Sequence, residues 1–118
     1  LIHPTAIIMN KKNVSVGYGS IISAGCVLTT DINIGDNVLV NLNTTIGHDC
    51  HIARMSSIMC GVNIAGGVQM GEGCFVGSGA NILNQIKLEE NVKIGAGAVV
   101  TTDVPAGKTA KGVPANWL

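Results

Sequence analysis

The chain contains 118 residues, with seven acidic and seven basic side chains and a formal net charge of zero at pH 7. This length predicts a single domain, and a charged fraction of only 12% without a basic stripe argues against nucleic-acid binding. The sequence lacks the run of about 18 apolar residues that a membrane-spanning helix needs, so no membrane partner is expected.

A hexapeptide repeat dominates the chain from residue 16 onwards. Every sixth residue is aliphatic, without a slip in register, at Val16, Ile22, Leu28, Ile34, Val40, Ile46, Ile52, Ile58, Ile64, Met70, Val76, Ile82, Leu88, Ile94 and Val100. A small or β-branched residue follows four positions after each of these: Ser20, Cys26, Ile32, Val38, Thr44, Cys50, Ser56, Val62, Val68, Cys74, Ala80, Ile86, Val92, Ala98 and Val104. This period is typical of a parallel β-helix.

The repeat also predicts which residues face inward. The two aliphatic or small positions point into the core, one outward residue lies between them on a short strand, and the next three residues form a corner. Three faces and three corners make a coil of 18 residues, so residues 16–105 give about five coils. Glycine is common at the first corner position, and we expect it to supply backbone angles that other residues adopt only at a cost. The corner glycines of this kind are Gly17, Gly35, Gly47, Gly71, Gly77 and Gly95.

The ends of the chain depart from the repeat. Residues 1–15 are expected to form a lead-in with an irregular stretch at 10–13, and residues 106–118 a loop-like tail that folds back over the last coil. The whole chain, 1–118, is therefore interpreted as one all-β domain.

Four cysteines are present, and none forms a CxxC pair. Cys26, Cys50 and Cys74 occupy inward positions, and Cys60 lies at a corner. We interpret them as reduced thiols of a cytoplasmic protein.

The segment His48-Asp49-Cys50-His51 is the one cluster with evident chemical potential. His48 and Asp49 both fall on a corner, where an outward carboxylate can orient an imidazole and raise its basicity. A solvated corner with two unremarkable polar residues remains the alternative. One coil further on lies Gly66, followed by Gly67, where bare backbone would admit a ligand and offer N–H groups to an oxyanion. His51 is expected at the surface, and His3, which precedes Pro4 ahead of the regular coils, is expected to cap the N-terminal end of the rod.

Three Gly-x-Gly corners, at 71–73, 77–79 and 95–97, could suggest a nucleotide site. They lack the strand-to-helix setting of a dinucleotide fingerprint, so corner geometry explains them better.

The coils, the corner Gly47-His48-Asp49-Cys50 and the closing segments 95–105 and 112–115 resemble hexapeptide-repeat acyltransferases, in particular the NeuD/PglD-like sugar acetyltransferases. The resemblance implies a left-handed parallel β-helix, a homotrimer with active sites between subunits, and acetyl-CoA as co-substrate without a metal. It also implies a nucleotide-sugar-binding domain ahead of Leu1.

The same resemblance implies residue roles. His48 would be the general base for direct attack of a sugar amine or hydroxyl on the thioester, and Asp49 its support. Gly66 would donate its backbone N–H to the acetyl carbonyl. Acetyl-CoA contacts would fall on Ser57, Ser78 and Ala96, with Ser57 standing where members of the family often have a second histidine.

Other functions of a parallel β-helix make specific demands on the sequence. A γ-class carbonic anhydrase needs three zinc-binding histidines, and the spacing of His3, His48 and His51 does not supply them. An ice-binding helix needs stacked threonine ladders, which the sequence lacks. A non-catalytic scaffold and a serine- or maltose-type acetyltransferase remain open alternatives.

Overall fold

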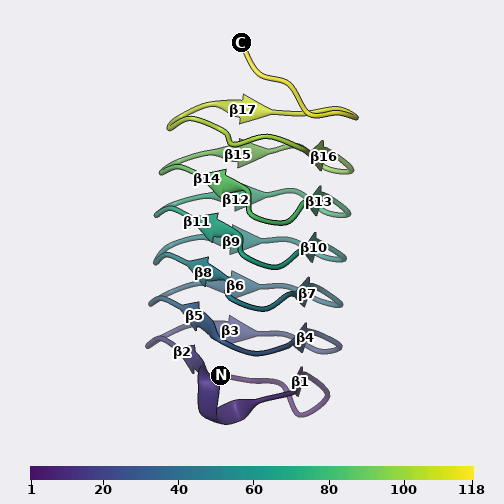
Figure 1. Ribbon diagram of the computed structural model, residues 1–118. Coiled ribbons are helices and arrows are strands. Elements are labelled where there is room, and N and C mark those ends of the chain that lie inside the picture. Colours follow the sequence, from purple (N-terminus) through teal and green to yellow (C-terminus); the bar gives the residue numbers. More distant parts are fainter.

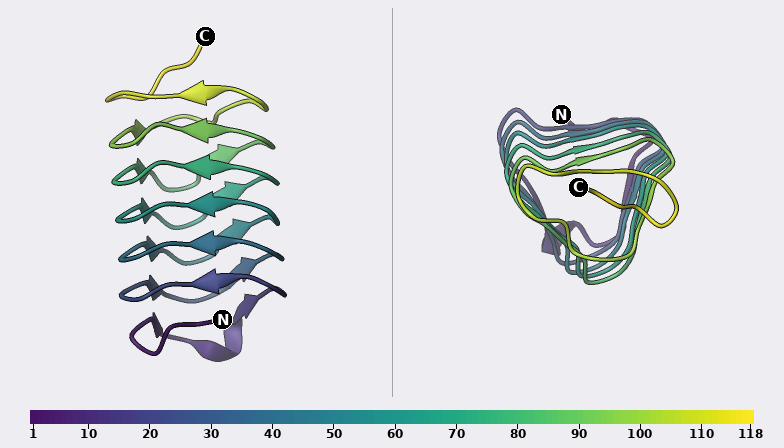
Figure 2. Two further views of the ribbon diagram at one scale, coloured as in Figure 1. Left: turned by 180° about the vertical axis from the view of Figure 1, so that it is seen from behind. Right: turned by 90° about the horizontal axis from the view of Figure 1, so that it is seen from above.

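The computed structural model, which describes residues 1–118, is a stack of short parallel strands wound into a triangular prism (Figure 1). Seventeen strands of two or three residues and one 3₁₀ helix, η1 (Lys11–Asn13), make up its regular structure. Seen along the axis, three flat sides meet at three corners (Figure 2). The prism measures 39 × 21 × 20 Å. No helix in it could cross a bilayer.

Each side of the prism is one parallel sheet. The first face contains β1 (Ile7–Ile8), β4 (Val27–Leu28), β7 (Thr45–Ile46), β10 (Asn63–Ile64), β13 (Asn81–Ile82) and β16 (Val99–Val100). The second face contains β2 (Val14–Val16), β5 (Ile32–Ile34), β8 (His51–Ile52), β11 (Gln69–Met70) and β14 (Lys87–Leu88). The third face contains β3 (Ile21–Ile22), β6 (Leu39–Val40), β9 (Ser57–Ile58), β12 (Phe75–Val76), β15 (Lys93–Ile94) and β17 (Thr109–Ala110).

The coil is left-handed, as the resemblance implied. As the chain rises in Figure 1, strands of the second face run leftward in front and those of the third face run rightward behind. The predicted fold class, an all-β left-handed parallel β-helix, is therefore confirmed.

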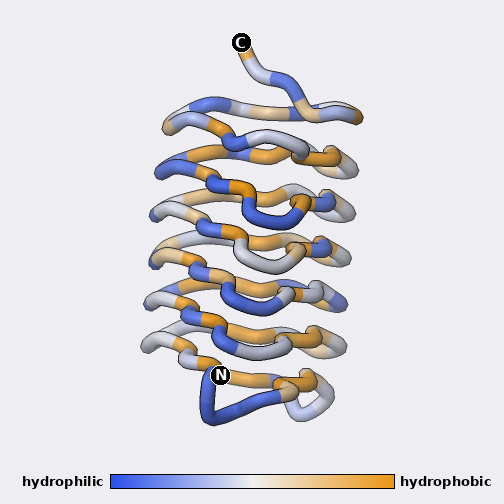
Figure 3. The backbone as a smooth tube through the Cα atoms, viewed as in Figure 1, coloured by the Kyte–Doolittle hydropathy of each residue, from blue (hydrophilic) through white to orange (hydrophobic).

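The inward register follows the sequence prediction. All fifteen small or β-branched positions are buried, as are fourteen of the fifteen aliphatic positions, with Val16 half-buried near the open end. Hydrophobic residues accordingly recur in every coil of the stack (Figure 3). Buried hydroxyls at the same inward positions donate to carbonyls of the next coil, as in the 2.7 Å bond from Ser20 Oγ to the Gly35 carbonyl.

The corners are turned by a residue that the sequence analysis did not single out. The third corner position is left-handed in every repeat from Gly19 to Gly97, with φ between 53° and 75°, and is occupied by Gly, Asn, Asp, Met or Gln. The glycines at the first corner position have no positive φ, so the expected role for them is wrong. They are small because coils approach closely there: a Cβ on Gly47 would lie 2.7 Å from the Gly66 nitrogen.

The stack also extends beyond the predicted coils and has about six turns instead of five. The strands β1 and β17 lie in the expected lead-in and tail, and each pairs with its sheet. Regular neighbours are separated by three hexapeptides, but Ile7 pairs with Val27, two positions beyond that spacing, and Lys93 pairs with Thr109, two positions short of it. These irregular first and last coils break the hexapeptide period, and for this reason periodicity alone missed them.

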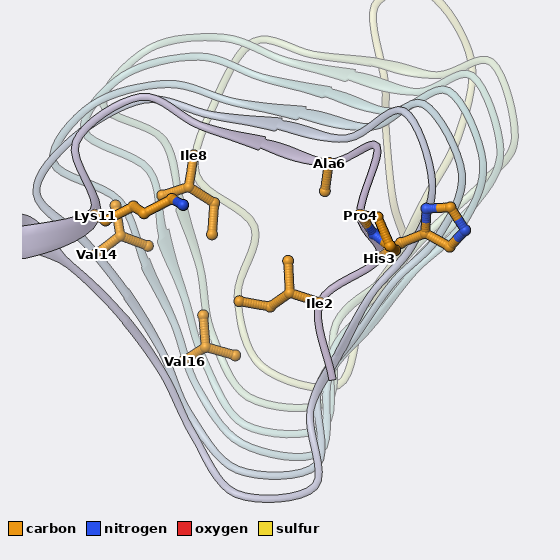
Figure 4. A pocket seen from close by; sticks show the side chains of 8 residues that line it. All are labelled: Ile2, His3, Pro4, Ala6, Ile8, Lys11, Val14 and Val16. Carbon is orange, nitrogen blue, oxygen red and sulfur yellow. The ribbon is translucent and has the colours of Figure 1, made fainter.

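The two ends of the prism differ. At the C-terminal end the tail crosses the last coil (Figure 2) and Trp117 packs on the core. At the N-terminal end an open cavity of about 550 Å³ remains, lined chiefly by apolar side chains. Ile2, Ile8, Val14 and Val16 point into it, whereas the ring of His3 points away (Figure 4).

Candidate active site

The predicted His-Asp pair forms at the corner that joins the first and second faces, between β7 and β8. His48 Nδ1 and Asp49 Oδ2 are 2.8 Å apart, and the two side chains are 64% and 67% exposed. Asp49 occupies the left-handed corner position, with φ 57°, and its N–H donates to the Thr30 carbonyl at 3.1 Å. This backbone hydrogen bond to the coil below holds the Asp49 carboxylate beside the imidazole.

Gly66 lies one coil above this pair and faces the imidazole. A Cβ built on Gly66 would be 2.5 Å from His48 Nε2, so the ring occupies the space that any other residue would fill. Neighbouring groups hold the backbone: Gly67 N–H donates to the His48 carbonyl at 2.8 Å, and Gln85 N–H donates to the Gly66 carbonyl at 2.9 Å. The Gly66 N–H itself has no acceptor within the chain.

This arrangement suits proton acceptance at Nε2. When Nδ1 donates its proton to the Asp49 carboxylate, the other ring nitrogen of neutral His48 carries a free lone pair. That lone pair lies on the side of Gly66, where an unpaired backbone donor is available. A base and an oxyanion donor are therefore adjacent on one exposed corner.

The predicted cofactor contacts lie elsewhere on the same chain. Ser57 is half-buried on β9 of the third face, and Ser78 and Ala96 are exposed on the corner that joins the third and first faces. This second corner is open: a Cβ built on Gly61, Gly79 or Gly97 would meet no atom within 4 Å. One chain therefore does not bring these residues to His48, because the first face separates the two corners.

The inward cysteines are poorly suited to nucleophilic chemistry. Burial raises the pKa of the Cys26, Cys50 and Cys74 thiols, which lowers their thiolate fraction at neutral pH. Cys50 Sγ also donates to the Ala65 carbonyl at 3.2 Å. Cys60 is half-buried, and all four cysteines are free.

The remaining histidines lie apart from the pair. His3 Nδ1 is bonded to Thr5 Oγ1 at 2.9 Å in the N-terminal turn, and His51 is exposed on β8. No group of three or more His, Cys, Asp or Glu side chains in the chain is arranged to hold a metal ion.

The sequence analysis did not predict the cavity formed by the C-terminal tail. It has a volume of about 600 Å³ at the C-terminal end and is lined by Gly107, Lys108, Thr109, Lys111, Asn116, Trp117 and Leu118. The available signal was charge: four of the seven basic residues, Lys87, Lys93, Lys108 and Lys111, fall in the last third of the chain. None of the four cavities in the structure is lined by His48.

The chain is similar to known proteins in both sequence and structure. Residues 67–102 match the bacterial transferase hexapeptide family, described as six repeats. The acetyltransferase domain of PglB from Neisseria gonorrhoeae matches with a TM-score of 0.96 and 35% identity, over 100% of this chain and 57% of that one. The resemblance to hexapeptide-repeat sugar acetyltransferases is confirmed.

Two further solved structures match nearly the whole of this chain. Perosamine N-acetyltransferase from Caulobacter crescentus, in complex with CoA and GDP-perosamine, has a TM-score of 0.95 and 32% identity over 99% of this chain and 55% of that one. WeeI from Acinetobacter baumannii has a TM-score of 0.92 and 30% identity over 98% and 56%. The chain thus spans little more than half the length of these three structures.

Proposed function

We propose that this chain is an acyltransferase domain that moves an acetyl group from acetyl-CoA to an amine or hydroxyl of a nucleotide-linked sugar, with His48 as general base. The observation that carries the proposal is the His48–Asp49 pair, whose free ring nitrogen lies against Gly66 and its unpaired N–H. Support for the substrates comes from the matched enzymes, which include one crystallised with acetyl coenzyme A and one with CoA and GDP-perosamine. No metal is required.

The reaction proceeds by direct attack. The acceptor nitrogen or oxygen bonds to the thioester carbonyl carbon while its proton passes to His48 Nε2. The carbonyl oxygen becomes an oxyanion that accepts a hydrogen bond from the Gly66 N–H. Collapse of the tetrahedral intermediate breaks the carbon–sulfur bond. The leaving sulfur takes the proton from the His48 imidazolium, so CoA departs as the thiol and His48 returns to its neutral form. Asp49 stabilises the imidazolium in between.

Assembly of the site requires a second copy of the chain. The first face borders both the His48 corner and the open corner that carries Ser78 and Ala96. If three copies pack with this face toward a three-fold axis, the His48 corner of each copy lies beside the open corner of the next. The outward residues of the first face carry no charge, in keeping with burial: Ile7, Val27, Thr45, Asn63, Asn81 and Val99. A homotrimer with three sites between subunits follows.

The acyl carrier would run along the open corner of the neighbouring subunit. Ser78 and Ala96 project there beside Gly79 and Gly97, where the backbone leaves open space. Ser57 would line the third-face side of the same groove. The four free thiols further support a reducing location, which we take to be the cytoplasm.

Replacement of His48 tests the proposal. His48→Ala should lower kcat by about 10²–10⁴, the usual contribution of a positioned base. Acetyl-CoA binding, measured by calorimetry, should stay unchanged. His51→Ala is the matched control, because His51 is exposed on the adjoining strand and has no carboxylate partner. Full activity of His48→Ala would refute His48 as the general base, and a parent protein without acetyl transfer would leave a non-catalytic rod as the better account.

A further inference from the structure

Two side chains from neighbouring coils border the glycine pair beside His48. The nearest atoms to a Cβ built on Gly66 all belong to the His48 ring, in the coil below. The nearest atoms to a Cβ built on Gly67 all belong to the Gln85 side chain, in the coil above, with Cγ at 3.3 Å and Nε2 at 3.5 Å. The bare backbone of the two glycines therefore lies between an imidazole and a carboxamide.

Few backbone hydrogen-bond donors at this position are free. Gly67 N–H donates to the His48 carbonyl at 2.8 Å, and Gln85 N–H donates to the Gly66 carbonyl at 2.9 Å. Of these three residues of the upper coils, Gly66, Gly67 and Gln85, only Gly66 keeps an unpaired N–H. Sites that stabilise an oxyanion combine backbone N–H groups with Asn or Gln side chains. A second donor beside Gly66 must therefore come from a side chain.

The backbone of Gln85 is unusual for its residue type. Seven non-glycine residues are left-handed, and five of them are Asn or Asp, which tolerate this conformation best. The other two are Met55 and Gln85, both with φ 63°. The Gln85 side chain is exposed and makes no hydrogen bond within the chain. Local backbone strain of this kind is concentrated at functional sites, and here it accompanies a carboxamide that is free to bind a ligand.

We propose that Gln85 is a further catalytic residue, whose Nε2–H donates a second hydrogen bond to the oxyanion beside the Gly66 N–H. This assignment rests on the proposed function, which supplies the oxyanion. As the acceptor bonds to the thioester carbon, the carbonyl oxygen gains a negative charge that both donors face. No proton leaves the carboxamide, and the carbonyl double bond re-forms when the carbon–sulfur bond breaks.

The variant Gln85→Met tests this role, because Met55 occupies the equivalent corner position with the same φ of 63°. The substitution keeps an unbranched side chain and removes the donor. The kcat for acetyl transfer should fall about 10²–10³-fold, the usual effect of losing one oxyanion donor. The KM for acetyl-CoA and the melting temperature should stay unchanged. A parental kcat, or a loss found only in KM, would overturn the assignment.

The reverse exchange, Met55→Gln, is the matched control and should keep the parental rate and stability, since Met55 lies at the corner between the second and third faces. Gln85→Gly guards against a folding defect, because glycine adopts positive φ readily. It should melt close to the parent protein and lose rate to a similar extent. A fully active Gln85→Gly variant beside an inactive His48→Ala variant would refute this inference and leave the proposed function intact. A parent protein without acetyl transfer would refute both.

Discussion

The absence of a side chain at Gly66 matters as much as the presence of one at His48. The imidazole fills the space that a side chain on Gly66 would need, and the backbone N–H of Gly66 remains unpaired. Asp49 holds the opposite ring nitrogen from a left-handed corner position, a conformation that Asp adopts more readily than most residues. The base, its partner and the oxyanion donor thus depend on two backbone positions in successive coils.

Gly66→Ala should therefore separate activity from stability. The added Cβ would lie 2.5 Å from His48 Nε2 and displace the ring, and misplacement on the scale of 1 Å can cost about 10²-fold in rate. Gly66 has no positive φ, and the end of a side chain can move, so the melting temperature should change little. Steady-state kinetics beside a thermal melt give both readings. A parental rate in the alanine variant would mean that the ring position is not critical.

The core is stabilised by the stacking of inward aliphatic residues from successive coils. Ile58 is fully buried and pairs in register with Val40 below and Val76 above. Such a core is uniform along the rod, so a fault in one rung affects both neighbours.

Ile58→Asp should strongly destabilise the protein, because a carboxylate without a partner would be buried between two aliphatic rungs. Denaturant unfolding should show a loss of several kcal/mol, or the variant should fail to fold. Ser57→Asp on the same strand is the control for folding, since Ser57 points outward and is only half-buried. Equal stability of the two variants would contradict the inward register.

The sequence predicted these elements well where the period holds and poorly where it changes. Fifteen repeats identify the buried residues because a side chain's direction depends only on its place in the hexapeptide. The longer first coil and the shorter last coil do not fit that rule, so β1 and β17 were not foreseen. The His48–Asp49 contact was predictable because its members are adjacent on one corner. The C-terminal cavity was not, because a tail without periodicity forms it.

For the molecule as a whole, the proposed site depends on the first face, which carries no charged outward residue. This face separates the His48 corner from the open corner that carries Ser78 and Ala96. The outward ladder of that face is held by side-chain bonds from Thr45 Oγ1 to Asn63 Oδ1 at 2.8 Å and from Asn63 Nδ2 to Asn81 Oδ1 at 3.0 Å. The second face, by contrast, carries His51, Gln69 and Lys87 in the equivalent ladder.

Asn63→Arg should prevent trimer formation, because three like charges would meet near the three-fold axis, and it should abolish acetyl transfer. Gln69→Arg is the matched control: it is also an exposed outward strand residue, one strand further along the chain, but lies on the second face. Sedimentation velocity gives the oligomeric state and a transfer assay the activity. An active trimer carrying Asn63→Arg would show that another face lies at the axis.

The left-handed residue at every sixth position also means that the regular region can change in length only by whole coils. Loss or gain of one residue in the regular region would turn every later side chain to the wrong side of its strand. Three whole hexapeptides, however, would add one rung of about 4.8 Å and leave the inner and outer surfaces unchanged. Irregular turns occur only in the first and last coils, where no further coil must match their register.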